Sequence, residues 1–392
     1  MPSHSKKSVL FAGQCYYNAW YLSRELRKLG WRADVLNWDQ NENDQMYYHG
    51  EDFRFFCRGK ADKIRHLKFY LKSLFKYDIF HFSNTRGMHF GAGLAEIFKN
   101  FLPEHWYIKL LKRFRKKIVY SNNGCMDGVS QSSFRKWGPE PVCDICRWRD
   151  VPEVCSDKRN LAWGKFRNAM ADYQITLGGN RADYNDDPRV HEVPQFYCLD
   201  HNFWRTDLPV PPEYRLPYPE DTVKIYHAVG NFALRTTAGE NKNIKCTHIY
   251  LPLIERLKSE GHKIELIFFT DVPNKTLRYY QAQADIFVDM LTYGWFGANV
   301  REGMMLGKPC VCFLRPEWLE SMRQEIPDYV AELPVVSATP QTIYYVLKDL
   351  IEHPDKRKEI GEKSRAFAVK WHSAEAGAKK FDKIYSELLK EK

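Results

Sequence analysis

The chain has 392 residues, of which 44% are hydrophobic, and its 59 lysines and arginines against 49 aspartates and glutamates give a formal net charge of +10. This length is about two to three times that of a typical domain of roughly 150 residues, so two domains with their own cores are expected. The positive charge favours polyanionic partners such as phosphates, anionic lipids or nucleic acids without choosing among them. No segment approaches the roughly 20 apolar residues of a membrane span, and the N-terminal residues lack the apolar core and cleavage site of a signal peptide. A transmembrane protein is therefore excluded, and we expect a cytoplasmic protein with peripheral membrane contact as an open alternative.

The first half of the chain alternates between predicted strands and helices. A strand over residues 8–13, a helix over 18–30 that stops at Gly30, and a strand over 32–38 form a βαβ opening. Three further apolar runs predict strands that end in polar turns, at 77–83, 116–124 and 172–180. This order predicts an α/β domain with a doubly wound sheet.

A proline-rich stretch divides the chain. Five prolines fall between Leu208 and Thr222 without any periodic pattern, which indicates a stiff and extended linker. After the linker the alternation restarts, with strands predicted over 223–230, 263–270, 284–291 and 309–314 and a helix over 247–261. The remaining residues are helical nearly throughout, with Ser373 as the cap of the last helix.

This organisation predicts two Rossmann-like domains that face a central cleft. The expected bounds are 1–208 for the first domain, with a cysteine-containing insertion near 125–170, then 209–222 for the linker, 223–370 for the second domain, and 371–392 for a C-terminal helix that packs back across the domains.

The stretch YGWFGANVREGMMLGKP, residues 293–309, predicts a short helix that begins just after a glycine-bounded turn. The free N–H groups and the positive dipole end of such a helix form an anion site. Gly294 and Gly297 allow the backbone to approach a phosphate closely. Glu302 lies a little over one turn further on, where its carboxylate can accept hydrogen bonds from both hydroxyls of a ribose. The alternative is an ordinary exposed helix glutamate beside Arg301.

A basic loop, residues 231–247, follows the first strand of the second half and carries Arg235, Lys242 and Lys245. Ligands of parallel α/β sheets bind at the carboxyl ends of the strands, which is where this loop begins. Cations there can neutralise a diphosphate leaving group as its charge develops. A solvated surface loop is the alternative.

At this point the residues resemble the donor domain of GT-B glycosyltransferases of the group 1 (GT4-like) type. The resemblance covers most of the chain and is strongest over about 223–385. It implies that Glu302 binds the nucleotide ribose, that Lys245 binds the donor phosphates, and that Lys242 or Arg235 takes the place of a phosphate arginine. It also implies that the donor site includes four residues of the turn, namely Gly294, Trp295, Phe296 and Gly297.

The chain departs from this family at several positions. Gly294 stands where the family has a glutamate that holds donor-sugar hydroxyls, Cys246 replaces a glycine, and Gly303 replaces a helix alanine. In the first half, Asn123 stands where the family has a histidine near the donor sugar, and Asp127 is displaced by one position. Altered donor specificity and lost catalysis both fit these departures.

The resemblance extends to the first half. Gly13 is expected in the donor site, and Asn18, His81 and Arg86 are candidates for acceptor binding, although a lone histidine at a strand end is more often structural. Lys245, Asn123 and Glu302 are the expected catalytic set. The family also implies retaining transfer without a bound metal, which rests on the analogy alone.

Four cysteines form a separate candidate site. Cys143 and Cys146 have the Cys-x2-Cys spacing of a zinc knuckle, Cys155 follows closely, and Cys125 is a plausible fourth ligand. Free thiols are the alternative to a structural zinc ion.

The leading interpretation is a glycosyltransferase that moves a sugar from a nucleotide-sugar donor to a glycan or lipid-linked glycan acceptor. No cofactor is expected for catalysis, and UDP-sugars are the first expected donors and GDP-sugars the second. A catalytically silent GT-B protein that binds a nucleotide or a glycan is the first alternative. A zinc-knuckle protein that binds nucleic acid is the second, and it is disfavoured because the basic residues are dispersed.

Overall fold

The computed structural model describes residues 7–391 except 84–86, 123, 126, 139–141, 177–180 and 238. The chain divides into two compact units. The first unit consists of Met1–Val129, Arg159–Leu199 and Ala374–Lys392, and the second consists of Ser130–Lys158 and Asp200–Ser373. The second unit therefore includes much of the stretch that the sequence assigns to an insertion of the first domain.

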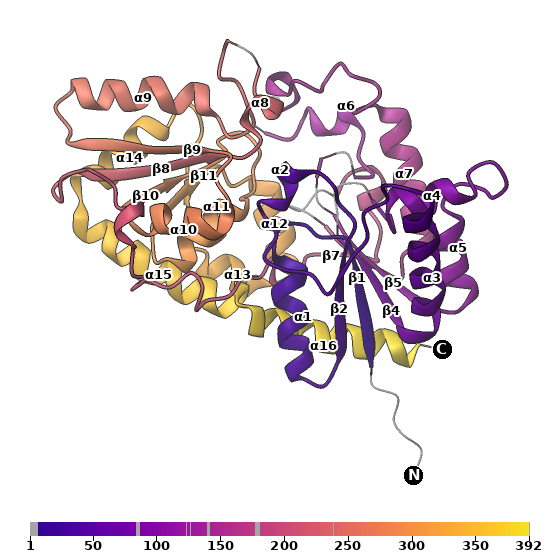
Figure 1. The fold of residues 1–392 in the computed structure, drawn as a ribbon. Helices are drawn as coiled ribbons and strands as arrows, with labels where there is room; N and C mark the ends of the chain where they lie inside the picture. Colours follow the sequence, from indigo (N-terminus) through magenta and orange to yellow (C-terminus); the bar gives the residue numbers. More distant parts are fainter. Residues whose placement is uncertain are drawn as a thin grey trace. The chain divides into compact units, whose positions relative to one another are not determined.

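A parallel sheet of seven strands forms the centre of the first unit (Figure 1). In spatial order its strands are β3 (Phe53–Arg54), β2 (Arg32–Asn37), β1 (Ser8–Ala12), β4 (Ile79–Phe82), β5 (Lys117–Ser121), β6 (Tyr173–Ile175) and β7 (Val190–His191). Its helices are α1 (Asn18–Lys28), α2 (Glu42–Gln45), α3 (Lys60–Lys76), α4 (Ala92–Ile97), α5 (Trp106–Arg113), α7 (Asp157–Met170) and α16 (Ala374–Lys390). Short 3-10 turns occur at Asp183–Asn185 and Pro194–Phe196.

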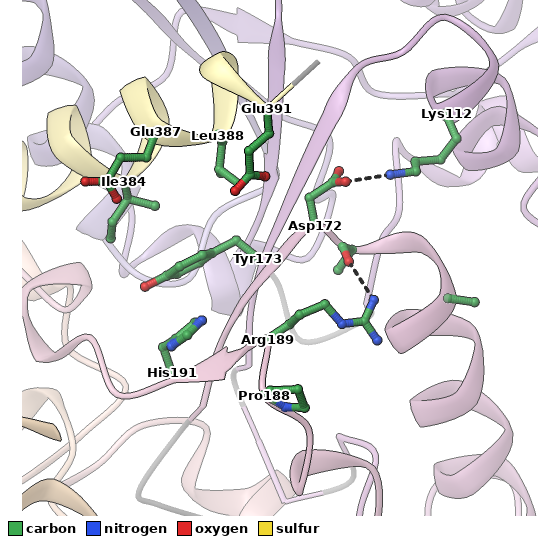
Figure 2. Close-up of a pocket in the computed structure, with 12 residues that line it drawn as sticks. Lys112, Asp172, Tyr173, Pro188, Arg189, His191, Ile384, Glu387, Leu388 and Glu391 are labelled. Atoms are coloured by element: carbon green, nitrogen blue, oxygen red, sulfur yellow. Dashed lines mark hydrogen bonds and ion pairs between the residues drawn. The ribbon is translucent and has the colours of Figure 1, made fainter. Parts of the chain in front are cut away.

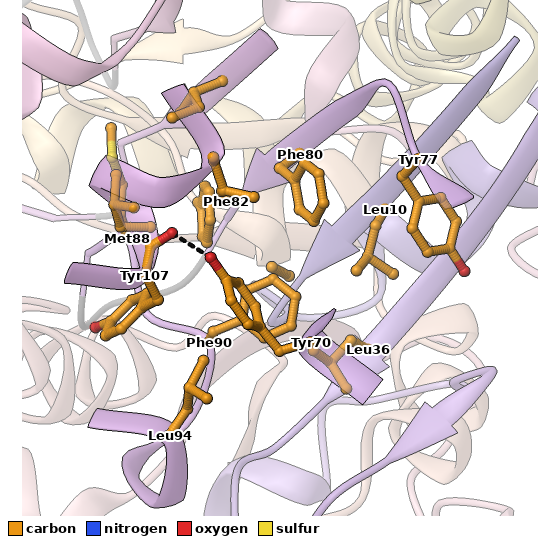
Figure 3. Close-up of a cluster of buried hydrophobic side chains, with 14 of the residues drawn as sticks. Leu10, Leu36, Tyr70, Tyr77, Phe80, Phe82, Met88, Phe90, Leu94 and Tyr107 are labelled. Atoms are coloured by element: carbon orange, nitrogen blue, oxygen red, sulfur yellow. Dashed lines mark hydrogen bonds between the residues drawn. The ribbon is translucent and has the colours of Figure 1, made fainter. Parts of the chain in front are cut away.

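The two faces of this sheet carry different helices because side chains alternate along each strand. On β4, Phe80 and Phe82 belong to an apolar core that α3 and α5 cover, as Figure 3 shows. Within that core the hydroxyl of Tyr70 on α3 donates a hydrogen bond to the carbonyl of Tyr107 on α5, at 2.5 Å. This bond and the shared core attach both helices to the same face of the sheet.

His81 points to the opposite face of β4, toward α16. Its ring nitrogens are 2.6 Å from the hydroxyls of Tyr385 and Ser121, and its ring packs beside Phe196 and Phe381. The imidazole is completely buried, and burial lowers its pKa to about 3. The contact places the C-terminal helix in the first unit, where it packs against α1.

A parallel sheet of five strands forms the centre of the second unit. In spatial order its strands are β12 (Val336–Ser337), β11 (Cys310–Cys312), β10 (Ile286–Val288), β8 (Val223–Val229) and β9 (Ile264–Thr270). Its helices are α6 (Gln131–Phe134), α8 (Phe232–Arg235), α9 (Thr247–Ser259), α10 (Asn274–Ala282), α11 (Ala298–Met305), α12 (Pro316–Glu325), α13 (Pro327–Glu332), α14 (Ile343–Glu352) and α15 (Pro354–His372). Short 3-10 turns occur at Val142–Ile145 and Pro212–Tyr214.

Helix α11 lies unusually close to this sheet at Gly303. A Cβ atom added there would lie 2.7 Å from the ring of Phe287 on β10 and 2.8 Å from the sulfur of Cys310 on β11. The glycine that departs from the family pattern is therefore required by packing. The close approach sets the position of the N-terminus of α11 relative to the carboxyl ends of the strands.

The burial of His81 predicts a specific pH dependence of stability. The folded state keeps the imidazole neutral, whereas the unfolded chain protonates it below a pKa of about 6.5. The contribution of His81 is therefore fully present above about pH 6.5 and is lost as the pH falls toward 3. We expect the stability advantage of the wild type over His81→Gln to shrink by about 2 kcal/mol between pH 7.5 and 5. Urea unfolding at both pH values measures it, and an unchanged difference would contradict the neutral, buried imidazole.

Candidate functional site

The loops that follow β8, β10 and β11 meet at the carboxyl edge of the second sheet, because neighbouring strands in it are parallel. This is the edge at which open α/β sheets bind their ligands. The loops supply Lys245, Asp289, Gly294 and Arg315, which lie within a single unit of the chain.

A buried asparagine shapes the basic loop. The side chain of Asn243 donates to the hydroxyl of Thr247 at 2.9 Å and accepts the backbone N–H of Lys245 at 3.0 Å. His227 on β8 approaches the same hydroxyl to 2.8 Å. Cys246 then takes a left-handed conformation with a φ of 61°, which explains why the family has a glycine at that position. The network fixes Lys245 at the start of α9.

Lys245 forms a nearly buried ion pair with Asp289, the residue that follows β10. Its Nζ lies 2.5 Å from Oδ1 of Asp289, and the side chains are 13% and 1% exposed. The other carboxylate oxygen accepts the N–H of Gly297, the N-cap residue of α11, at 3.4 Å. A cation, a carboxylate and the positive end of a helix dipole therefore converge at one point. An anionic ligand at this point would take contacts that Asp289 now makes.

Gly294 adopts a conformation that side chains rarely tolerate. Its φ is +84°, and a Cβ atom there would lie 2.6 Å from Cβ of Arg315. The carbonyl of Gly294 also accepts the N–H of Arg315 at 2.9 Å. The glutamate that the family has at this position does not fit unless Arg315 moves.

Trp137, from the Ser130–Lys158 segment, covers this turn. Its indole N–H donates to the carbonyl of Tyr293, and the guanidinium of Arg315 lies 3.5 Å from the centre of its ring. Phe134 stacks on the indole with ring centres 4.8 Å apart. The Arg315 side chain is therefore held between the Gly294 turn and an aromatic ring, in cation–π contact.

Glu302 is completely buried on α11, so the alternative of an ordinary exposed helix glutamate is wrong. Its two carboxylate oxygens accept hydrogen bonds from the side-chain amides of Asn274 at 2.9 Å and Gln281 at 2.6 Å, both on α10. The carboxylate thus ties α10 to α11. A ribose could reach it only by sharing or replacing these amides, and the clamp role stays a prediction.

The other expected donor residues lie around the same edge. Trp295 stacks on Phe296 with an interplanar angle of 12°, and Phe296 packs against Trp318 in the core. Arg235 ends α8 and is half-buried. Lys242 is more exposed and pairs with Glu240 at 2.8 Å, so it is held less firmly than Lys245.

The expected residues of the first unit have mixed outcomes. Gly13 follows β1 with a φ of +90°, and Asn18 opens α1 with its amide bonded to the carbonyl of Cys15 at 3.0 Å. The expectation that His81 binds an acceptor is corrected, because the side chain has no exposed surface and both ring nitrogens have hydroxyl partners. Arg86 and Asn123 lie outside the described residues.

The expected zinc site is not supported. Among the residues that the structure describes, no three histidine, cysteine, aspartate or glutamate side chains are arranged to hold a metal ion. Cys125 belongs to the first unit and Cys143, Cys146 and Cys155 to the second. Burial raises the pKa of Cys143 to about 11, so this residue is a thiol at neutral pH. Among the described residues, none of the ten cysteines forms a disulfide bond.

A cavity of about 490 Å³ lies in the first unit, at the edge of the first sheet where strands β6 and β7 begin (Figure 2). Tyr173 and His191 stack beside it with ring centres 4.4 Å apart, and Lys112 pairs with Asp172 at 2.7 Å. The amino ends of strands are not where α/β sheets bind substrates. This cavity therefore does not coincide with the edge of a sheet at which a donor is expected.

The sequence indicated Lys245 and the Gly294 turn but missed three neighbours. Asp289 could have been found, since it is an acidic residue directly after an apolar strand. Arg315 and Trp137 carried no such signal. They come close to Gly294 only through the folding of segments that are far apart in the chain.

Comparisons with known proteins identify the fold. No protein-family model matches the chain, and no curated protein matches it in sequence. Among solved structures, it is similar to sucrose-phosphate synthase from Thermosynechococcus elongatus, with a TM-score of 0.57 and 14% identity over 99% of this chain and 100% of that one. A glycosyltransferase from Rickettsia africae ESF-5 has a TM-score of 0.55 and 12% identity over 99% and 100%. The HepE protein of Anabaena in complex with UDP has a TM-score of 0.56 and 12% identity over 97% and 100%.

Identities this low show the fold alone. Together with the two parallel Rossmann-like sheets of seven and five strands, they confirm the expected GT-B fold and the helical C-terminal tail.

The geometry of Gly294 predicts the effect of adding a side chain. Gly294→Ala should cost about 1–2 kcal/mol for its positive φ and about 1–3 kcal/mol more for the contact with Arg315. Gly239→Ala is the matched control, because its φ is +80° and no atom lies within 4 Å of an added Cβ. Urea unfolding of both variants gives the difference. Equal losses of stability would show that Arg315 does not exclude a side chain.

Proposed function

We propose that this chain, which has the GT-B glycosyltransferase fold, transfers a sugar from a nucleotide-sugar donor to a glycan or lipid-linked glycan acceptor. The observation that carries the proposal is the convergence of Lys245, Asp289 and the N-terminus of α11 at the carboxyl edge of the second sheet. A nucleoside diphosphate is the ligand class that such a cation and helix terminus bind.

The same groups account for the chemistry. As the bond between the sugar and the diphosphate breaks, its electron pair moves to the phosphate oxygen, and negative charge grows on the leaving group. The ammonium of Lys245 and the N–H groups at the start of α11 stabilise that charge. Both are held in advance, Lys245 by the Asn243 network and α11 by its close packing at Gly303. The family resemblance adds retention of the sugar configuration, with no metal at the diphosphate.

UDP-sugars are the first donors to test and GDP-sugars the second. The HepE protein of Anabaena, which shares the fold, has been solved with UDP and with UDP-glucose. A protein that binds a nucleotide or glycan without turnover is the second candidate, and Gly294 favours it, because the expected sugar-binding carboxylate is absent there. Release of UDP from UDP-sugars in the presence of glycan acceptors separates the two candidates.

Lys245→Met should weaken UDP binding by about tenfold to a hundredfold, because it removes a charge-assisted contact worth about 1.5–3 kcal/mol. Isothermal titration calorimetry measures the affinity. Lys263→Met is the matched control, since Lys263 is 74% exposed and lies just before β9, at the opposite end of the sheet.

The control should bind UDP like the wild type. Affinity that is unchanged in Lys245→Met would remove this residue from the site. An equal loss of affinity in Lys263→Met would show that the effect comes from the net charge of the protein and not from the position of Lys245.

Glu302→Gln tests the ribose clamp. It should lower the affinity for UDP more than the affinity for pyrophosphate, because only the nucleotide carries the hydroxyls that the carboxylate would accept. Gln281→Met is the control, since it removes the 2.6 Å hydrogen bond between the helices and leaves the carboxylate in place. Equal losses for UDP and pyrophosphate in Glu302→Gln would contradict the clamp.

A further inference from the structure

Helix α3 exposes apolar side chains on its outer face, and so does the residue just after α5. On α3, Phe75 is 78% exposed, Ile64 55% and Leu71 44%, and Phe114, just after α5, is 41% exposed. The α3 residues follow a helical spacing of seven and four, so they line one face of the helix over about 17 Å. This stripe is separate from the inner face, which packs in the core shown in Figure 3.

The two helices lie side by side and form one continuous surface. Tyr70 of α3 contacts Trp106 of α5 with ring centres 5.7 Å apart, and further along both helices Phe75 contacts Phe114 edge to face, also at 5.7 Å. Figure 1 shows both helices on the same side of the first sheet. We call Ile64, Leu71, Phe75 and Phe114, with the cations around them, the α3/α5 surface.

This surface is strongly basic. Residues 60–76 and 106–117 contain twelve lysines and arginines and a single acidic residue, Asp62. In the part of the chain that the structure describes, five of these cations pair with a carboxylate and seven have no acidic partner. These seven are Lys60, Lys68, Lys72, Lys109, Arg113, Arg115 and Lys116. Their distribution contrasts with α14 and α15, where basic residues pair with acidic ones along and between the helices.

We propose that the α3/α5 surface docks on an anionic lipid bilayer. Exposed phenylalanine and aliphatic side chains insert at the boundary between headgroups and acyl chains, and the lysines and arginines beside them contact lipid phosphates. Four apolar side chains surrounded by lysines and arginines match the surface of a bilayer, whose acyl chains are apolar and whose anionic headgroups are negatively charged. A nucleic-acid backbone matches only the charge, and a second copy of this chain would bring like charges together.

Attachment of this kind is peripheral. No helix among the described residues is long and apolar enough to cross a membrane. The inference stands on the first unit alone and does not depend on the proposed transfer reaction.

Flotation of the full chain with lipid vesicles tests the proposal. We expect it to float with phosphatidylcholine vesicles that contain about one third phosphatidylglycerol, and not with pure phosphatidylcholine. Added salt should weaken the binding, because it screens the charges. Equal binding to both vesicles, or no binding to either, would overturn the proposal.

Two sets of variants locate the contact. The triple variant Lys68→Gln, Lys72→Gln, Arg113→Gln should lower partitioning about a hundredfold, and Phe75→Ser should lower it about tenfold. The charge-matched control is Lys358→Gln, Lys379→Gln, Lys383→Gln, three exposed lysines on α15 and α16. Tyr345→Ser controls for the loss of an exposed ring, since Tyr345 is 70% exposed on α14. Both controls should float like the wild type.

The same variants distinguish a bilayer from nucleic acid and from a second copy of the chain as the partner of this surface. Equal losses in the control variants would show general electrostatic adsorption and overturn the assignment. A DNA or RNA oligomer that binds through the three cations but not through Phe75 would assign the surface to nucleic acid instead. If the chain does not bind vesicles, and light scattering shows a dimer that Phe75→Ser dissociates, the α3/α5 surface would be assigned to a second copy of the chain. All substituted side chains are exposed, and circular dichroism spectra like that of the wild type confirm that each variant is folded.

Discussion

The ion pair between Lys245 and Asp289 is the interaction on which the candidate site depends. With side chains 13% and 1% exposed, neither charge is stable there without the other, and the loss of one partner of a buried pair costs about 3–5 kcal/mol. The pair also joins three elements, because Lys245 lies two residues before α9, Asp289 directly follows β10, and the carboxylate accepts the N–H at the start of α11. A diphosphate would compete with Asp289 for the same cation and the same helix end. In this structure the carboxylate of Asp289 is the anion that the cation and the helix end contact.

The Gly294 turn gives a physical reason why this chain has a glycine where the family pattern has a glutamate. Its positive φ and the contact with Arg315 exclude a side chain, so the missing glutamate is a consequence of the local packing. Trp137 holds the guanidinium of Arg315 on its other side. The family places a carboxylate near the donor sugar at this position, whereas this chain has an arginine beside the turn. If the chain is a transferase, its donor contacts here differ in charge from those that the family implies.

In the first unit, one face of the sheet packs against the C-terminal helix, and the helices on the other face carry exposed apolar and basic side chains. His81, at the end of a strand, was a candidate for acceptor binding, and the structure makes it a neutral bridge between β4, β5 and α16. The opposite face of the same sheet is covered by α3 and α5, whose outer surfaces are apolar and cationic. Docking of these helices on a bilayer would bring the protein to the surface where lipid-linked glycans are found. The proposed acceptor class and the proposed membrane contact therefore agree, although each rests on separate residues.

The sequence by itself determined the α/β class, the two parallel sheets, the helical tail, and the position of the basic loop and the glycine turn. These features follow from local patterns: apolar runs of strand length, helical periodicity, and glycines and caps at the ends of elements. Only the tertiary structure decided which side chains meet. Glu302 is buried and bonded to Asn274 and Gln281, and the Ser130–Lys158 segment belongs to the second unit. Both results depend on contacts between residues that are distant in the chain. Burial and pairing of charges depend on such contacts, and no spacing of residues along a chain encodes them.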